Sequence, residues 1–325
     1  MYKGLFPQLI AGPIVRYRDV ADQIENRALN CDEFYTGIQR FIVGLGKKMI
    51  FADTLGGVAD MAFQMPSGDL SFSAAWLGAV CYGLQIYFDF SGYSDMAIGL
   101  GKMFGFHFLE NFNYPYISCS IREFWKRWHI SLSLWFRDYL YIPLGGNKFK
   151  SSRTYLNLII IFFLCGLWHG ARWTYVIWGL WHGAFLVLER TRFGKSIKAM
   201  PKLLGYFYTS MVVLVGWVFF RSETWSGAVY YLKAMIGFGS VSGVSAAELL
   251  NTKTMIVLLF AFVGTTSVMS NLRLLSSNSF LSVKGLRRLT TCVAVIHNVV
   301  LFSILVICSI LLSEGTYNPF IYFRF

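Results

Sequence analysis

The sequence TYLNLIIIFFLCGLWHGA occupies residues 154–171 and is followed, after a single arginine, by WTYVIWGLWHGAFLVL at residues 173–188. Both stretches are almost free of charge, and both approach the roughly 20 apolar residues that a helix needs to cross a bilayer. Because they are joined only at Arg172, the two helices must share one turn. This pair predicts two adjacent membrane helices, and the rest of the fold is inferred outward from it.

The remainder of the chain is apolar in the same way. Of its 325 residues, 55% are hydrophobic and 14% are charged, whereas roughly a quarter are charged in soluble domains; the mean hydropathy is +0.51. This composition predicts an all-α, polytopic transmembrane helical bundle. The expected spans are residues 72–90, 154–171, 173–188, 203–220, 254–269 and 292–312, with a weaker span at 34–52 and amphipathic, interfacial or re-entrant helices at 93–109, 121–141 and 225–238.

Basic residues predict the orientation of these spans. Loops 145–153, 189–202 and 270–290 carry clusters of Lys and Arg, whereas residues 53–71 carry three aspartates and no Lys or Arg. The positive-inside rule therefore places the three basic loops in the cytoplasm and 53–71 on the opposite side. The net charge of +12 then favours anionic lipid headgroups, and not nucleic acid, as the partner of the basic residues.

The pattern GLWHG occurs twice, at residues 166–170 and 179–183. If both helices start at the cytoplasmic surface, each rises only about 24–27 Å, so the turn near His169 lies below the outer surface. A submerged turn is tolerated where protein or a water-filled cavity surrounds it. An imidazole there, with an ordinary pKa of about 6.5, can accept and return a proton. We therefore predict a catalytic His169, and an interhelical hydrogen bond for His182.

A second constellation covers residues 121–139, where apolar and basic residues alternate at helical spacing. Glu123 and Arg127 stand as an i,i+4 pair, and the stretch is typical of an interfacial helix with a tryptophan belt. That interpretation leaves His129 and Ser131 unexplained. The basic residues also suit a phosphorylated donor such as coenzyme A, although lipid phosphates would select the same pattern.

A third constellation is the carboxylate pair Asp89 and Asp95 at the inner end of the 72–90 span. Ser91, Gly92 and Ser94 between them favour a turn or cap, with Asp95 at the start of the next helix. A structural role is therefore predicted for both aspartates.

Several familiar sequence motifs are absent. The chain has no Walker A loop, no complete GxGxxG and no GxSxG elbow, and it lacks HExxH and other metal-ligand spacings. No metal site is predicted.

Long stretches of the chain resemble the membrane-bound O-acyltransferase superfamily, and most closely its alginate O-acetyltransferase membrane-subunit branch, which also includes the D-alanyl transfer protein of teichoic acid synthesis. These stretches cover essentially the whole chain: they are FPQLIAGPIVRY at 6–17, YFDFSGYSD at 87–95, NFNYPY at 111–116, residues 124–147, residues 166–183 and YNPFIYFRF at 317–325.

The resemblance implies a single membrane domain over residues 1–325, with the helices pinched into an hourglass whose outer funnel meets a cytoplasmic tunnel. His169 matches the near-invariant histidine of the family, and His129 matches its second motif position. Relatives carry several more helices before the motif at residue 6, so an N-terminal portion is expected to be missing. The implied location is the inner membrane of a bacterial cell, with multiple crossings.

The expected reaction is acyl transfer across that membrane from a cytoplasmic thioester, acetyl-CoA, with no bound cofactor. His169 is the general base, and His129 orients or polarises the acyl carbonyl. The indole N–H groups of Trp128 and Trp168 are candidate oxyanion donors. Arg137 and Asp138 are candidate substrate-binding residues. The acceptor is an extracytoplasmic acetyltransferase partner protein or the hydroxyl of an exported polysaccharide such as alginate.

Three alternatives remain open. One is D-alanyl transfer to teichoic acid from a carrier protein, and another is acylation of a lipid. The third is a proton-coupled transporter that uses His169, His182, Asp89 and Asp95 as a relay, although the inverted repeats typical of transporters are not visible.

Overall fold

The computed structural model describes residues 12–66, 68–148, 150–268 and 284–314. In this part of the chain the regular elements are helices, with one isolated parallel bridge between Leu70 and Val244. The all-α class predicted from composition is confirmed.

The elements are α1 (Tyr17–Asn26), α2 (Cys31–Gly46), η3 (Lys47–Ala52), α3 (Asp53–Phe63), α4 (Phe72–Met103), η4 (Pro115–Ile117), α5 (Ile121–Arg127), α6 (Ile130–Phe136), η5 (Arg137–Tyr141), α7 (Ser151–His169), α8 (Trp173–Leu188), α9 (Arg192–Ala199), α10 (Lys202–Arg221), α11 (Trp225–Lys233), η6 (Ala234–Phe238), α12 (Ala246–Leu249), α13 (Thr252–Gly264) and α15 (Lys284–Ser313).

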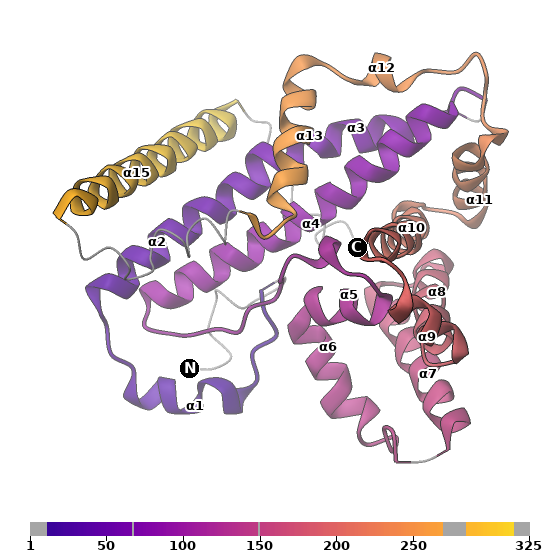
Figure 1. The fold of residues 1–325 in the computed structure, drawn as a ribbon, viewed down its shortest axis with the longest axis horizontal. Helices are drawn as coiled ribbons and strands as arrows, with labels where there is room; N and C mark the ends of the chain where they lie inside the picture. Colours follow the sequence, from indigo (N-terminus) through magenta and orange to yellow (C-terminus); the bar gives the residue numbers. More distant parts are fainter. Residues whose placement is uncertain (1–11, 67, 149, 269–283, 315–325) are drawn as a thin grey trace.

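Helix α4 is a single rod of 32 residues. The contiguous elements α2, η3 and α3 pack along its length (Figure 1). The rod starts at Ser71, whose hydroxyl accepts a hydrogen bond from the N–H of Ala74. At about 1.5 Å per residue the rod is about 48 Å long, which exceeds the ~30 Å of a hydrocarbon core. Its length therefore exceeds that of one perpendicular crossing, but α4 is not among the described helices that are apolar enough to span a membrane.

Glycines let α2 and α4 approach until their backbones touch. A Cβ on Gly44 would lie 2.6 Å from the carbonyl oxygen of Gly92, and one on Gly37 would lie 2.7 Å from that of Gly99. Both distances are shorter than any ordinary contact, so neither position has room for a side chain. Small residues at such contacts are typical of helix pairs in membranes, where close packing replaces the hydrophobic effect as the source of association.

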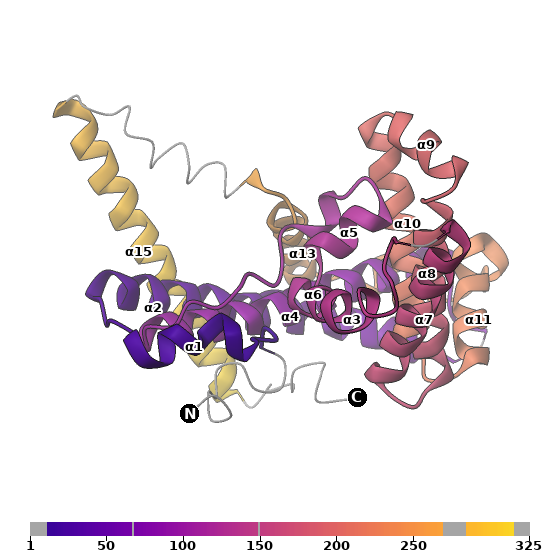
Figure 2. The same cartoon turned by 90° about the horizontal axis from the view of Figure 1, so that it is seen from below.

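The second half of the fold is built around the α7–α8 hairpin, with α10 packed against α8 (Figure 2). A Cβ on Gly179 would lie 2.1 Å from the carbonyl oxygen of Phe162, and one on Gly166 would lie 2.5 Å from that of Tyr175. The first glycine of each GLWHG pattern therefore sits on the contact between the two helices. Neither position has room for a side chain, so both glycines allow α7 and α8 to pack closely.

The predicted spans all fall on helices. Among the described residues, α7, α10 and residues 292–313 of α15 are long and apolar enough to cross a membrane, and α8 and α13 are shorter apolar helices. The predicted span 254–269 ends early, at Gly264. Residues 53–71, which connect two of the expected spans, carry α3.

The turn predicted around Ser91, Gly92 and Ser94 is wrong, because α4 continues through it to Met103. Both serines are only 2% exposed, and Gly92 touches the backbone of α2. These small residues are therefore contact positions inside a helix pair. Residues 6–11, 270–283 and 317–325, which carry part of the predicted motifs and one basic loop, lie outside the described residues, and the sidedness of the chain stays a prediction.

Candidate active site

The turn between α7 and α8 directs His169 inward and its neighbours outward. His169 is the last residue of α7 and is 8% exposed, whereas Trp168 is 55% exposed and Trp173 is 77% exposed. Gly170 ends the helix with a φ of 148°, and a Cβ there would lie 3.0 Å from the ring of Tyr175. A residue with a side chain would be strained in that conformation, so the glycine after the histidine is what allows the tight turn.

His129 lies where the predicted helix is interrupted, and the sequence pattern does not show this interruption. The predicted helix over 121–141 is divided into α5, α6 and η5, and His129 joins the first two with φ 44° and ψ 56°. Left-handed backbone is uncommon for residues other than glycine. The predicted pair of Glu123 and Arg127 is confirmed, with nitrogen and oxygen 2.9 Å apart.

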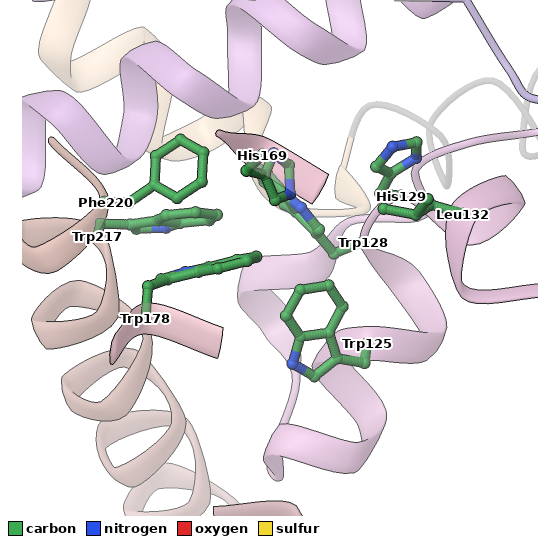
Figure 3. Close-up of a pocket in the computed structure, with 8 residues that line it drawn as sticks. All are labelled: Trp125, Trp128, His129, Leu132, His169, Trp178, Trp217 and Phe220. Carbon is green, nitrogen blue, oxygen red and sulfur yellow. The ribbon is translucent and has the colours of Figure 1, made fainter. Parts of the chain in front are cut away.

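The two histidines line the same small cavity (Figure 3). Its walls come from α5, α6, α7, α8 and α10, and the space has room for about one water molecule. Aromatic rings surround the imidazole of His169: Trp178 lies 5.0 Å and Phe220 5.1 Å from it, both edge-on. The lining residues are Trp125, Trp128, His129, Leu132, His169, Trp178, Trp217 and Phe220.

Burial favours the neutral form of His129. The side chain lies in the loop between α5 and α6, outside the predicted spans, and is 4% exposed. Removal from water lowers the pKa of His129 well below its usual range, and His169 nearby lowers it further. A neutral imidazole at pH 7 can accept a proton or a hydrogen bond, which the charged form cannot.

The other predicted substrate residues divide into two groups. Trp128 is 2% exposed and forms part of the cavity wall. Trp168 touches His169 edge-on, with ring centres 4.9 Å apart, but does not line the cavity. Arg137 and Asp138 also lie off the cavity, in η5, where they pair with each other at 2.7 Å. Hydrogen bonds from Arg137 and then Arg16 hold the pKa of the Asp138 carboxyl below its usual range.

Three tryptophans that the sequence interpretation did not select, Trp125, Trp178 and Trp217, form part of the cavity. The indole nitrogens of Trp125 and Trp178 are buried, and neither has a hydrogen-bond partner in the described part of the chain. A buried donor without an acceptor is costly, so two such donors around one cavity suit an acceptor that arrives with a substrate. The only sequence signal was the abundance of tryptophan around the two histidines.

His182 is fully buried beside this cavity and does not form the interhelical hydrogen bond that was predicted. Neither ring nitrogen has a hydrogen-bond partner among the described residues. The ring stacks on Phe124 and meets Trp125 edge-on. Gly216 of α10 makes room for it, because a Cβ there would lie 2.7 Å from Nε2. The contacts of His182 are therefore packing contacts.

Asp89 and Asp95 form ion pairs between α4 and the α2–η3 segment. Asp89 lies 2.9 Å from the ammonium of Lys48, and Asp95 lies 2.6 Å from that of Lys47 and 2.8 Å from the guanidinium of Arg40. These contacts agree with the structural role predicted for both aspartates, although that role is an ion pair and not a helix cap. Neither aspartate lines the histidine cavity.

Glu189, the residue after α8, fixes the start of α5. Its carboxylate accepts hydrogen bonds from the backbone N–H groups of Ile121 at 2.6 Å and Arg122 at 3.0 Å, and from the hydroxyl of Tyr208 at 3.3 Å. Burial raises the pKa of Glu189, and the two backbone bonds oppose that rise by holding the charged form. Since α5 carries Trp125, this carboxylate helps position the cavity wall.

The apolar helices and the buried pair of histidines define a helical membrane protein with a polar site in its interior. The sequence profile of the membrane-bound O-acyltransferase family matches residues 2–219. The chain belongs to this family.

Curated relatives share the family but differ in the group they transfer. A probable alginate O-acetylase of Azotobacter vinelandii is 48% identical over 263 residues, which cover 79% of this chain and 52% of the relative. A peptidoglycan O-acetyltransferase of Helicobacter pylori is 41% identical over 77% of this chain and 49% of its own length. A teichoic acid D-alanyltransferase of Bacillus subtilis is 31% identical over 70% of this chain and 60% of its own length. The chain thus spans about half the length of these relatives.

Proposed function

We propose that this chain is the acyl-transferring part of a bacterial membrane enzyme that O-acetylates an exported polysaccharide. The observation that carries the proposal is the placement of His129 and His169 on one buried, tryptophan-walled cavity. The greater similarity to O-acetylating relatives than to a D-alanyl-transferring relative supports acetyl as the group transferred.

The proposed reaction begins when the imidazole of His169 removes the proton from an acceptor hydroxyl. The alkoxide oxygen attacks the carbonyl carbon of the thioester donor, acetyl-CoA, and a tetrahedral oxyanion forms. When the intermediate collapses, the carbon–sulfur bond breaks and the thiolate leaves with the proton that His169 carried. The products are an acetyl ester and free coenzyme A, so no cofactor needs to remain bound.

The oxyanion requires donors, and we assign this role to the buried indoles of the cavity wall. The N–H groups of Trp125 and Trp178 lack partners among the described residues, and Trp128 completes the same wall. Trp168 is exposed away from the cavity, so we assign it no donor role. His129, which lines the same cavity, supplies a second polar contact as an acceptor for a hydroxyl of the substrate.

The donor enters from the cytoplasm, and the acceptor arrives from the other side of the inner membrane. That acceptor is either the hydroxyl of a polysaccharide such as alginate or an extracytoplasmic partner protein that passes the acetyl group on. The apolar helices and their basic flanking residues support a multi-pass arrangement within one membrane domain, in contact with anionic lipids.

A proton-coupled transporter is less well supported by the geometry. The relay would need Asp89 and Asp95 to exchange protons with the histidines. Both carboxylates are instead paired with cations, and neither lines the cavity.

The test is His169→Asn in the native cell, with His107→Asn as the matched control. His107 is half exposed and contacts Glu33 on the surface. The His169 variant should reach the membrane at the wild-type level but leave the exported polysaccharide without O-acetyl groups, and the control should retain them. Membranes supplied with acetyl-labelled coenzyme A should show the same contrast in label transfer. Normal acetylation in the His169 variant would refute the proposal, and loss of alanyl esters with O-acetyl groups intact would favour D-alanyl transfer.

A further inference from the structure

The side chain of Asn111 connects the left-handed loop at His129 to the segment after α4. Its Oδ1 lies 3.1 Å from the backbone nitrogen of Ser131, 2.9 Å from the Ser131 hydroxyl and 3.2 Å from Nδ1 of His129. The backbone oxygen of Asn111 also accepts a hydrogen bond from the N–H of Ile130 at 3.0 Å. One asparagine, 1% exposed, therefore contacts three successive residues, His129 and the first two residues of α6.

These contacts fix which ring nitrogen of His129 carries the proton. The backbone N–H of Ser131 can only donate, so the group facing it must be the amide oxygen of Asn111. An amide oxygen can only accept, so Nδ1 of His129 must donate to it. The neutral imidazole then carries its hydrogen on Nδ1, and Nε2 is left as the basic nitrogen of the ring.

We propose that Asn111 is a positioning residue that holds His129 as the Nδ1–H tautomer, with Nε2 as its acceptor nitrogen. The proposal rests on the proposed function for its catalytic meaning, because it specifies what His129 presents to the reacting groups. A wrong tautomer would place a hydrogen where the site needs a lone pair, and in other enzymes that error is a severe defect.

The choice of an amide over a carboxylate is informative. The Nδ2 of Asn111 is buried and has no hydrogen-bond partner in the described part of the chain. An aspartate would accept the same three hydrogen bonds and would not leave a buried N–H group unsatisfied. An anionic oxygen would, however, stabilise the imidazolium form of His129. Asparagine orients the ring and keeps it neutral.

Few other groups act on the charge of His129. In the part of the chain that the structure describes, His169 faces it across the cavity. Phe90 of α4 meets the ring edge-on at 4.6 Å, and the remaining cavity walls are indoles, a phenyl ring and a leucine. A new carboxylate at position 111 would therefore be the dominant charge beside this imidazole.

The experiment compares Asn111→Asp, Asn111→Leu and the control Asn113→Asp in the full-length protein. Asn113 is exposed, so its substitution adds the same charge outside the site. We expect Asn111→Leu to lower kcat by about 10–100-fold with KM for acetyl-CoA changed less than about twofold. Asn111→Asp should move the acidic limb of the kcat profile upward by about one pH unit or more, and the control should match the wild type. Wild-type profiles in both Asn111 variants would overturn the proposal.

A readout without catalysis separates this inference from the proposed function. Nitrogen-15 spectra of histidine-labelled wild-type protein, with His129→Gln identifying the signal, should report a protonated Nδ1 and a bare Nε2 at pH 7. The opposite tautomer, or an imidazolium, would refute the assignment even if transfer is normal. The expected tautomer in a protein without any transferase activity would leave the positioning intact and refute the proposed function. Asn111→Asp retains the oxygen that accepts the hydrogen bonds, so a folding failure confined to the leucine variant would not mask the result.

Discussion

Removing the carboxylate of Glu189 should loosen the cavity wall from a distance. The side chain accepts two backbone hydrogen bonds at the start of α5, and a hydrogen bond to a charged group contributes about 1.5–3 kcal/mol. Because Glu189 is partly exposed, we reduce this contribution to about 1–2 kcal/mol per bond. For the two backbone bonds together, Glu189→Ala should lower the free energy of unfolding by about 2–4 kcal/mol. Glu189→Gln retains one acceptor oxygen and should lose less. Tyr208→Phe removes only the 3.3 Å bond and should lose least.

The first assay is thermal unfolding of the detergent-solubilised protein. The second assay measures how much polysaccharide each variant acetylates in cells. Exposed Glu223 provides the control, Glu223→Ala. For a chain of this length, a loss of 2–4 kcal/mol corresponds to a fall of about 3–6 °C in melting temperature, and the acetylation defect should follow the same order as the stability loss. An alanine variant that melts with the control would show that the start of α5 does not depend on this carboxylate.

Two further substitutions test other parts of the structure. Lys48→Met removes the ammonium that pairs with the buried carboxylate of Asp89, 3% exposed, and should lower the free energy of unfolding by about 3–5 kcal/mol. Asp89→Asn should be milder, because Lys48 keeps its ion pair with Asp53 at 2.8 Å. Equal melting temperatures for the two variants would contradict the argument. Trp178→Phe removes a buried indole N–H from the cavity wall and should lower kcat by about 10-fold or more. The control Trp173→Phe, on the exposed turn, should change kcat by less than about twofold. Equal kcat values for the two variants would exclude Trp178 as a donor.

The helices were largely predictable, because hydrophobic runs of membrane length have few other solutions. The errors in the predicted helix boundaries occur at small residues, which are found both in turns and at close contacts between helices. Ser91 and Gly92 are turn formers when read locally, but in a helix pair they are the residues that allow close approach. The partner that decides between these roles is Gly44, which lies 48 residues away in sequence. A local pattern does not contain that information.

The site was predictable in its two histidines and in Trp128, and the pairing of the histidines came from resemblance to a family. Trp168 adjoins His169 in the chain, yet successive residues on a helix point about 100° apart, so adjacency in sequence does not mean adjacency to the cavity. Trp178 reaches the same cavity from the next helix. Asn111 lies 18 residues before His129, and only the folded chain shows which oxygen faces which nitrogen.

The two histidines reach the cavity by different physical routes, and this difference explains why the surrounding residues matter unequally. His169 ends a regular helix, and Gly170 provides the turn without strain. His129 occupies a left-handed conformation that costs about 1–3 kcal/mol. That cost is offset by the hydrogen bonds from the loop to Asn111 and by the bond that Ser131 accepts from the N–H of Ile14. The loop therefore has its shape only when distant segments are in place, so substitutions at its anchors should change the chemistry before they unfold the bundle.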